Sequence, residues 1–305
     1  MGCTLPEVWT SGTTGEPKRV QITDAMLAAH REAAARRIGH TAESVWIHCL
    51  PPTSIGAVAL LDRCAHLGGT VRDIGRFTLD AFVQALPGAT HASIVPTMLH
   101  RIVAGNVPPP KGFQCLLVGG DALAPELASQ ALDAGWPVYA TYGLTEACSQ
   151  VATATPEELR RNPGTSGRPL DGVQLSIEDG RITVAGPTVA GGRYVTDDLG
   201  RIEEGRLYVE GRLATRIVTG GRTVDARDIE RRLEALPGVQ RAAVVGLTDA
   251  TWGQVVGAVI QGALPDVVDW PSHLKPRRMV QAEVPVTSMG KVRRSALADY
   301  FTTPA

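Results

Sequence analysis

Lysine, aromatic residues and closely spaced cysteines are all scarce in this chain of 305 residues. Only four lysines (Lys18, Lys111, Lys275 and Lys291) stand among 30 basic residues, and aromatic residues make up 5% of the sequence. The five cysteines are scattered and contain no C-x-x-C pair, which argues against a disulfide framework and against a structural zinc site. We therefore expect a reducing, cytoplasmic environment.

A surplus of one charge and long apolar runs are also missing. The formal net charge is −1, so we expect no chain-wide attraction to nucleic acid or to an anionic membrane. No apolar run is long enough to be inserted in a membrane, and the first residues lack the pattern of a secretory signal. The apolar content of 44% with 20% charged residues is typical of a globular protein, and the length suits about two domains.

What the chain does contain, close to its start, is a dense polar segment of hydroxyl residues, glycines and a lysine: Thr10-Ser11-Gly12-Thr13-Thr14-Gly15-Glu16-Pro17-Lys18. Glycine lets the backbone approach a ligand closely, and consecutive N–H groups in such a turn attract anions. Lys18 adds a positive charge suited to phosphate. The segment predicts a phosphate-binding loop, although a polar surface turn has the same composition and the spacing differs from that of the common NTPase loop.

Strands and helices alternate through the first half of the chain. Apolar, β-rich runs occur at Val45–Leu50, Ala92–Val95, Cys115–Val118 and Val138–Tyr142. Helical patterns cover Ala25–Arg37, Ile55–Leu67, Thr78–Leu86, Thr97–Val103 and Pro125–Ala134. The alternation predicts βαβ units and a largely parallel sheet, whose ligands bind beyond the carboxyl ends of the strands.

The pattern changes after Ser149. Short strands at Gln174–Ile177, Arg181–Val184 and Arg206–Val209 predict a small antiparallel or barrel-like section. Farther on, a helix over Val224–Leu236 and strands over Ala242–Leu247 and Val255–Ile260 predict a separate α+β domain. We therefore expect an α/β fold with a large N-terminal domain of parallel α/β layers over residues 1–212 and a small C-terminal domain over residues 213–305.

Six motifs follow one another in a fixed order. They are Ser11–Lys18, Tyr142-Gly143-Leu144-Thr145-Glu146, Thr196-Asp197-Asp198-Leu199-Gly200, Gly211-Arg212, Gly220-Gly221 followed by Ile229-Glu230, and Pro285-x-Thr287-x-x-Gly290-Lys291. As a set they resemble the motifs of the acyl-adenylate-forming (AMP-binding) superfamily, of the acyl- and aryl-CoA ligase type. An ordered set is far more specific than a single motif. Asp197 departs from the pattern, because the family has glycine there.

The resemblance implies two half-reactions. A carboxylate attacks the α-phosphorus of ATP and releases pyrophosphate, and coenzyme A then displaces AMP from the acyl-adenylate. Thr145, Glu146 and Lys291 would be the catalytic residues, with Glu146 offering an oxygen to Mg²⁺ and Lys291 neutralising charge that develops at the α-phosphate. The resemblance assigns the β- and γ-phosphates to Thr10, Ser11, Gly12, Thr13, Thr14, Gly15 and Lys18.

The nucleotide itself would lie against the second and third motifs. The resemblance implies that Gly119, Gly120 and Asp121 line the adenine edge and that Tyr142, beside Gly143, stacks on the adenine ring. Asp198 would accept hydrogen bonds from the ribose hydroxyls, with Arg212 beside it. Gly220 and Gly221 would serve the thiol side.

Each of these residues also has a purely structural interpretation. Tyr142 suits a core aromatic, Glu146 the first turn of a helix and Asp198 a turn. Arg212 suits a surface ion pair, and Lys291 one charge of a solvated basic tail.

Two features depart from the family pattern. The C-terminal domain of the family rotates between the half-reactions about a hinge residue that is commonly aspartate, and Ala214 occupies that position here. The family also carries a long region before the phosphate loop, where this sequence has nine residues. We therefore expect a domain truncated at its start, whose uncovered sheet edge favours a homodimer.

The substrate would be a small carboxylic acid. Ser93–Leu99 resembles the segment before a helix in acyl- and aryl-CoA ligases, and Val138–Val151 with Thr251–Gln254 resembles o-succinylbenzoate–CoA ligases. We place the acid near Ser54, Val95 and Pro96, with Ser54 where those ligases have a histidine or an aromatic residue. The favoured substrate is o-succinylbenzoate or a related acid. An enzyme that loads a carrier protein, or a non-catalytic nucleotide-binding homologue, remains an alternative.

Overall fold

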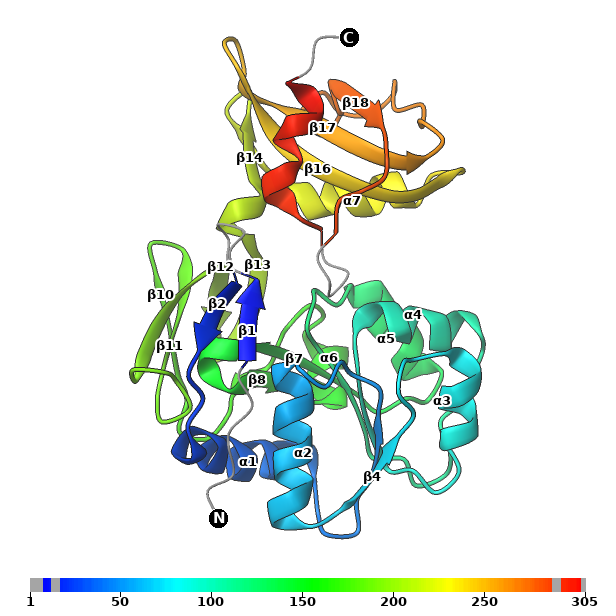
Figure 1. Cartoon of the computed structure of the whole chain (residues 1–305), viewed down its shortest axis with the longest axis vertical. Helices are drawn as coiled ribbons and strands as arrows, with labels where there is room; N and C mark the ends of the chain where they lie inside the picture. The colour runs from blue at the N-terminus through cyan, green and yellow to red at the C-terminus, as the bar shows by residue number, and fades with distance from the viewer. Residues whose placement is uncertain (1–7, 12–16, 287–291, 303–305) are drawn as a thin grey trace. The chain divides into compact units, whose positions relative to one another are not determined.

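The structure, a computed structural model, describes residues 8–11, 17–286 and 292–302. The chain forms two units that divide between Glu210 and Gly211, with Ser11 and Pro17, at the ends of β1 and β2, also assigned to the second unit, and each unit is described by itself (Figure 1). Over the described residues, no helix combines the length and the apolar character that a membrane span requires.

The first unit contains most of the helices and three sheets. Its elements are β1 (Val8–Ser11), β2 (Pro17–Val20), α1 (Asp24–Ile38), β3 (Val45–His48), α2 (Ile55–Leu67), β4 (Thr70–Asp73), α3 (Leu79–Ala85), β5 (His91–Ile94), α4 (Pro96–Ala104), β6 (Cys115–Val118), α5 (Pro125–Asp133), β7 (Val138–Leu144), η1 (Thr145–Ala147), β8 (Ser149–Ala154), α6 (Pro156–Arg161), β9 (Arg168–Pro169), β10 (Gln174–Glu178), β11 (Arg181–Ala185), β12 (Arg193–Glu203) and β13 (Arg206–Arg212, whose last two residues belong to the second unit).

The main sheet of this unit has seven strands in the order β4-β3-β5-β6-β7-β8-β9. The pairs from β4 to β7 are parallel, and β8 and β9 are antiparallel to their neighbours. The parallel, layered α/β prediction is confirmed. The carboxyl ends of β3, β5, β6 and β7 consequently share one edge of the sheet.

Alternate residues of these strands pack on helices at opposite faces of the sheet. Ile47 and Leu116 join a core with residues of α3, α4, α5 and α6, whereas their neighbours Trp46 and Leu117 join residues of α1 and α2. Side chains of a strand point alternately to its two faces, so near-continuous apolar strands such as Cys115–Val118 can be buried on both sides.

The first three helices begin where the sequence supplies a capping oxygen, whereas α4 and α5 begin at a proline without a side-chain cap. The hydroxyls of Thr23, Ser54 and Thr78 each accept a backbone N–H at the start of α1, α2 and α3. Gly39, with φ of +69°, ends α1 in the left-handed conformation that glycine adopts without cost.

The small antiparallel section is a four-stranded sheet in the order β10-β11-β12-β13, and β1 pairs with β2 in a separate two-stranded sheet. The pairing of β11 with β12 is irregular: Thr183 lies opposite Val195, but Arg181 lies opposite Leu199. The irregularity falls at residues 196–198, a bulge that re-aims the side chains of the third motif.

The second unit packs a helix on a five-stranded sheet. It contains η2 (Leu213–Thr215), β14 (Arg216–Thr219), β15 (Arg222–Asp225), α7 (Ala226–Glu234), β16 (Val239–Asp249), β17 (Gly253–Gly262), β18 (Arg278–Gln281), η3 (Arg294–Ala296) and η4 (Ala298–Phe301). The strand order is β15-β14-β17-β16, with β18 parallel to β17. Ile229 and Leu233 of α7 are fully buried against this sheet.

Two local predictions need correction, and one strand was not predicted. The helix expected over Val224–Leu236 is shorter, because residues 222–225 pair as β15 and Asp225 caps the helix. The change of pattern placed after Ser149 comes too early, since β8 continues the main sheet. The long strand β12 was not expected, because its polar sequence lacks apolar alternation.

Candidate active site

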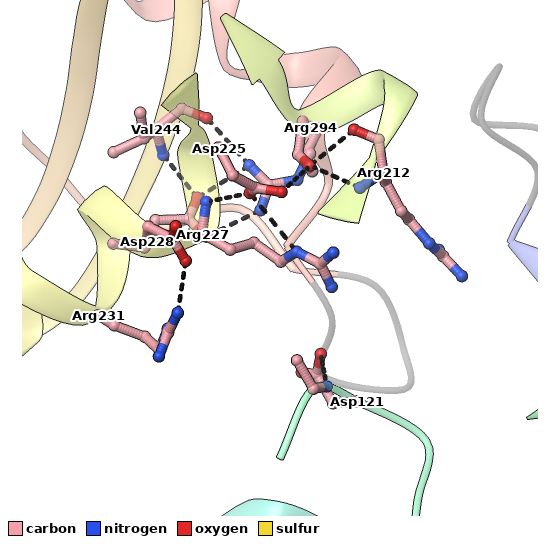
Figure 2. A network of polar contacts seen from close by, with 11 residues as sticks. Asp121, Arg212, Asp225, Arg227, Asp228, Arg231, Val244 and Arg294 are labelled. Carbon is pink, nitrogen blue, oxygen red and sulfur yellow. Dashed lines mark hydrogen bonds and ion pairs between the residues drawn. The ribbon is translucent and has the colours of Figure 1, made fainter. Parts of the chain in front are cut away.

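The carboxyl edge of the main sheet brings the predicted glycine pair next to the predicted acid pocket. A Cβ at Gly119 would lie 2.6 Å from Cγ2 of Thr141, so only glycine fits between β6 and β7. Gly120 has φ of +82°, and its Cβ would lie 3.5 Å from Cγ1 of Val95. The ends of β5, β6 and β7 are thus in close contact and leave backbone exposed where a flat ligand can approach. The adjacent Asp121 accepts the Ala122 N–H at 2.8 Å, which orders the turn (Figure 2).

The second motif forms a tight reversal between β7 and β8. A Cβ at Gly143 would lie 2.0 Å from the carbonyl oxygen of Ser149, and the register shifts between Tyr142 and Gly143. Thr145 and Glu146 occupy the one-turn helix η1. The Glu146 carbonyl accepts the Ala190 N–H at 2.9 Å, so the backbone that carries this carboxylate is held from a second segment.

Asp198 is brought to this reversal by β12. The Tyr142 hydroxyl donates to Oδ2 of Asp198 at 2.8 Å, and the Asp198 N–H donates to the Thr196 hydroxyl at 3.1 Å. The Asp198 side chain is buried in the first unit. A buried carboxylate that accepts a phenol hydrogen bond has a fixed orientation and retains lone pairs for further donors.

Glu146 has a matching partner on the same strand. The Tyr194 hydroxyl lies 3.3 Å from Oε1 of Glu146 and donates to it. Burial raises the pKa of the Tyr194 phenol, and the negative charge of Glu146 raises it further. The phenol therefore stays protonated at neutral pH and acts as a donor toward the carboxylate.

Asp197, which replaces the family's glycine, forms an ion pair. Its Oδ1 accepts Nη2 of Arg181 at 2.9 Å, while Nε of Arg181 donates to the Thr196 carbonyl at 2.7 Å. One guanidinium thus holds both the backbone and the extra carboxylate immediately before Asp198.

The residues placed in the acid pocket have local structural roles as well. The Ser54 hydroxyl accepts the Ala57 N–H at 3.2 Å and caps α2, and Pro96 is the buried first residue of α4. Val95 precedes α4 and lies near Gly120, as described above.

A buried cation lies on the other face of the sheet. Arg63 is 1% exposed, and its guanidinium carbon lies 4.8 Å from the centre of the Trp46 ring. Within the described part of the chain, its Nε and Nη1 have no hydrogen-bond partner. Burial lowers the pKa of Arg63 to about 10. A cation–π contact of this kind compensates only part of the cost of burying a charge.

In the second unit, the segment after Arg212 is held by a carboxylate. Oδ2 of Asp225 lies 3.0 Å from the Thr215 hydroxyl, and Oδ1 accepts the Arg227 N–H at 2.8 Å (Figure 2). A Cβ at Gly211 would lie 2.1 Å from the same Oδ2. Ala214 lies in η2 between these contacts, so Asp225 supplies a carboxylate to the segment in which Ala214 replaces the usual aspartate.

Arg294 and Glu230 form a partly buried ion pair near the segment that follows Arg212. Both terminal nitrogens of Arg294 lie 2.8 Å from the two carboxylate oxygens of Glu230, and Arg294 also donates to the Val244 carbonyl (Figure 2). Burial raises the pKa of Glu230, and the charge and hydrogen bonds of Arg294 oppose that shift.

Gly220 and Gly221 form the turn between β14 and β15. Their φ angles of +56° and +75° are those of a two-residue hairpin turn that favours glycine. A Cβ at Gly220 would lie 2.5 Å from the Trp252 ring, and the Arg277 guanidinium lies over that ring at 4.2 Å from its centre. The turn therefore rests on an aromatic support.

Two predicted groups fall partly or wholly outside the described residues. Gly12, Thr13, Thr14, Gly15 and Lys291 lie outside them, whereas Thr10, Ser11 and Lys18 lie on β1 and β2. Among the described residues, there is no group of three or more His, Cys, Asp and Glu side chains that could hold a metal ion. The single Glu146 carboxylate suits a magnesium ion that takes its remaining ligands from phosphates and water.

Sequence reasoning missed Tyr194, Arg181 and Arg63. Tyr194 lies on β12, a strand that was not expected, and the register irregularity at residues 196–198 separates it from Asp198, so regular alternation does not indicate its contact with Glu146. Arg181 and Arg63 gave no signal either, because neither belongs to a motif.

Comparison with known proteins agrees with this architecture. A family model described as "AMP-binding enzyme" matches residues 8–197. The chain is 34% identical over 283 residues to a 2-succinylbenzoate–CoA ligase of Bacillus anthracis, covering 83% of this chain and 59% of that protein. The chain is 32% identical over 308 residues to a ligase of the same description from Bacillus cytotoxicus, and the match covers 91% of this chain and 64% of that protein. The chain thus spans less than two thirds of the length of these curated relatives.

Solved structures of o-succinylbenzoate CoA synthetase are also similar to this chain. The o-succinylbenzoate CoA synthetase of Bacillus subtilis, in complex with its acyl-adenylate intermediate, superposes with a TM-score of 0.88 at 28% identity and covers 98% of this chain and 69% of that chain. Its complex with ATP and a magnesium ion gives a TM-score of 0.87 at 28% identity, with coverage of 96% and 69%.

Proposed function

This chain belongs to the family of AMP-binding enzymes, and we propose that it is an acid–thiol ligase. In the first step a carboxylic acid displaces pyrophosphate from ATP to give an acyl-adenylate. In the second step the thiol of coenzyme A displaces AMP to give a thioester.

The observation that carries this proposal is the pair of hydrogen bonds between the second and third motifs. Tyr142 to Asp198 at 2.8 Å and Tyr194 to Glu146 at 3.3 Å join segments far apart in the sequence into one polar group at the carboxyl edge of the main sheet. A turn and a core aromatic would not require two buried or half-buried carboxylates to be oriented by two phenols.

We assign the first step to residues of the first unit. Tyr142 offers a ring face to adenine, Asp198 accepts the ribose hydroxyls, and Thr145 donates to the α-phosphate. Glu146 would hold the metal, and Mg²⁺ when bound neutralises the phosphate oxygens and bridges them. The loop Thr10–Lys18 would hold the β- and γ-phosphates, and Lys291 would stabilise charge at the α-phosphate.

We assign the thiol step to the second unit. Gly220 and Gly221 would approach the incoming thiol, and rotation about Ala214 would exchange Lys291 for that turn. The hydrogen bonds of Asp225 with Thr215 and Arg227 stabilise one conformation of the segment that contains Ala214.

For the acid we propose o-succinylbenzoate or a related aryl acid, because the similar curated proteins and structures carry that substrate in their names. The test is ATP–pyrophosphate exchange with a panel of carboxylic acids that includes o-succinylbenzoate. Exchange with one acid, followed by thioester formation when coenzyme A is added, is the expected result. If a thioester forms only when a carrier protein is supplied, the acceptor is that protein and not coenzyme A. If the chain binds ATP but exchanges pyrophosphate with no acid, the ligase proposal is wrong.

We further propose that the enzyme acts in the cytoplasm as a homodimer. The described cysteines (Cys49, Cys64, Cys115 and Cys148) are free and buried, which suits a reducing compartment. Light scattering of the purified chain tests the dimer, and a mass of one chain would contradict it.

A further inference from the structure

Two different segments form hydrogen bonds with Glu146, one with its backbone and one with its carboxylate. Its backbone carbonyl accepts the Ala190 N–H, and its Oε1 accepts the Tyr194 phenol. The backbone hydrogen bond fixes the main chain of Glu146, but it does not restrict the side-chain torsion angles. The second bond acts on the carboxylate itself.

The Tyr194 side chain is suited to hold that carboxylate. Its ring packs in the apolar cluster that also contains Tyr142, Leu144 and Val184, so the position of the hydroxyl is set by packing. Tyr194 lies on β12, four residues before Asp198, and the register of β12 against β11 shifts at residues 196–198, between the two side chains. The same strand thus reaches both carboxylates of the candidate site.

The two phenols form a reciprocal arrangement. Tyr142 of β7 donates to Asp198 of β12, and Tyr194 of β12 donates to Glu146 directly after β7. β7 belongs to the seven-stranded sheet and β12 to the four-stranded sheet. The hydrogen bonds therefore connect the two sheets as well as orienting the two acids.

We propose that Tyr194 is a positioning residue for magnesium–nucleotide binding: its phenol holds Oε1 of Glu146 so that the carboxylate is presented to the metal. This inference rests on the proposed function, since it assigns the metal to Glu146. Tyr194 itself touches neither metal nor nucleotide in this assignment. Without its hydroxyl, the glutamate samples several rotamers and must be ordered each time the metal binds.

The test compares Tyr194→Phe with the wild type in the binding of ATP, measured by titration calorimetry with Mg²⁺ and with EDTA. The variant keeps the ring and loses one hydrogen bond to a charged group, so we expect the affinity for ATP with Mg²⁺ to fall about 5- to 20-fold. The affinity measured in EDTA should stay within about twofold, because only the metal-dependent part passes through Glu146. Tyr208→Phe, in which the altered ring stacks on Arg201, is the matched control and should leave both affinities unchanged.

A double-mutant cycle separates positioning from a structural effect. In a Glu146→Gln background, Tyr194→Phe should have little further effect on magnesium-dependent binding, because the group through which it acts is gone. If the two changes are additive, or if Tyr194→Phe lowers both affinities equally, Tyr194 supports only the fold and the proposal is wrong. The cycle remains informative even if Tyr194→Phe lowers the melting temperature, because each comparison is made between folded variants.

Failure of this inference is distinguishable from failure of the ligase proposal. If the wild type binds ATP with Mg²⁺ but exchanges no pyrophosphate with any acid, the ligase proposal fails while the calorimetric cycle still decides the role of Tyr194. If Mg²⁺ does not strengthen ATP binding in the wild type, the inference is overturned directly.

Discussion

The hydroxyl of Tyr142 donates to Oδ2 of Asp198 at 2.8 Å, although 56 positions separate the two residues in the chain. If Asp198 binds the ribose, the phenol sets the orientation in which the carboxylate meets the ribose hydroxyls. Tyr142→Phe keeps the ring that stacks on adenine and removes only this orientation. We expect the KM for ATP in pyrophosphate exchange to rise about 5- to 10-fold, less than the full value of one hydrogen bond to a charged group, because the ribose contacts themselves are kept.

The control for that prediction lies on the same strand. Tyr139 belongs to the cluster on the opposite face of the sheet, with Trp46 and Cys64. Tyr139→Phe should leave the KM for ATP unchanged, and an equal rise in both variants would argue against a role of the Tyr142–Asp198 bond in nucleotide binding.

Buried histidines predict acid sensitivity. Burial lowers the pKa of His30 to about 3, with a smaller contribution from the charge of Arg63, and burial also lowers the pKa of His91 to about 4. Both are neutral when folded and take up a proton on unfolding below about pH 6.5, so their stability contribution is complete above that pH and is lost as the pH falls. From pH 7 to pH 5 the free energy of unfolding should fall by up to about 2 kcal/mol for each.

Urea unfolding at several pH values measures this effect. His30→Gln should reduce the slope of stability against pH between pH 5 and 6.5, whereas the exposed His100→Gln should not. An unchanged slope in His30→Gln would show that this imidazole does not contribute.

The Glu230–Arg294 pair predicts a large stability effect in the second unit. Glu230→Gln leaves the guanidinium without its charged partner, and because Arg294 is partly exposed we expect a loss of about 2 kcal/mol in unfolding free energy, between the values for buried and exposed pairs. Asp228→Asn breaks the exposed pair with Arg231 and should cost less than about 1 kcal/mol. Chemical denaturation that gives equal losses for the two variants would contradict this ranking.

Gly220 and Gly221 differ in what surrounds them. Gly220→Ala places a methyl group against the Trp252 ring and should slow thioester formation more than pyrophosphate exchange, because the displaced turn belongs to the thiol side. Gly221→Asn should displace the turn less than Gly220→Ala, since a Cβ at Gly221 meets open space and asparagine tolerates the left-handed conformation. Equal loss of both half-reactions in Gly220→Ala would place the defect outside the thiol step.

Lys291 gives the sharpest separation of the two steps. Lys291→Ala should lose most adenylation, by about 100-fold or more if the lysine stabilises the transition state as a preorganised charge. The same variant should still convert a supplied acyl-adenylate to the thioester. Single-turnover measurements of each step provide the check, and equal loss of both would remove Lys291 from its assigned role.

Helices and buried strands of the main sheet were predictable because local signals agree there. Ile55–Leu67 and Cys115–Val118 have the expected bounds, since a capping serine and a glycine bracket the first and four consecutive apolar residues form the second. β12 was not predictable in the same way. Its charged sequence is stabilised by pairing with β11 and β13, a nonlocal effect that overrides propensity.

The candidate site was likewise predictable only in part. The motif residues were found from their order along the chain, but their partners were not. Tyr194 and Asp198 belong to two different carboxylate–phenol pairs and lie on either side of the register irregularity at residues 196–198, which leaves no clear sequence signal.

The Tyr142–Asp198 bond also has a consequence for the order of folding. It joins two sheets through a loop of more than fifty residues, and such a closure is slow compared with the formation of local helices. Nucleotide affinity should therefore be acquired late in refolding, after most of the helical signal has returned. A fluorescent ATP analogue added during refolding would then report the docking of β12 on β7 rather than the formation of either sheet.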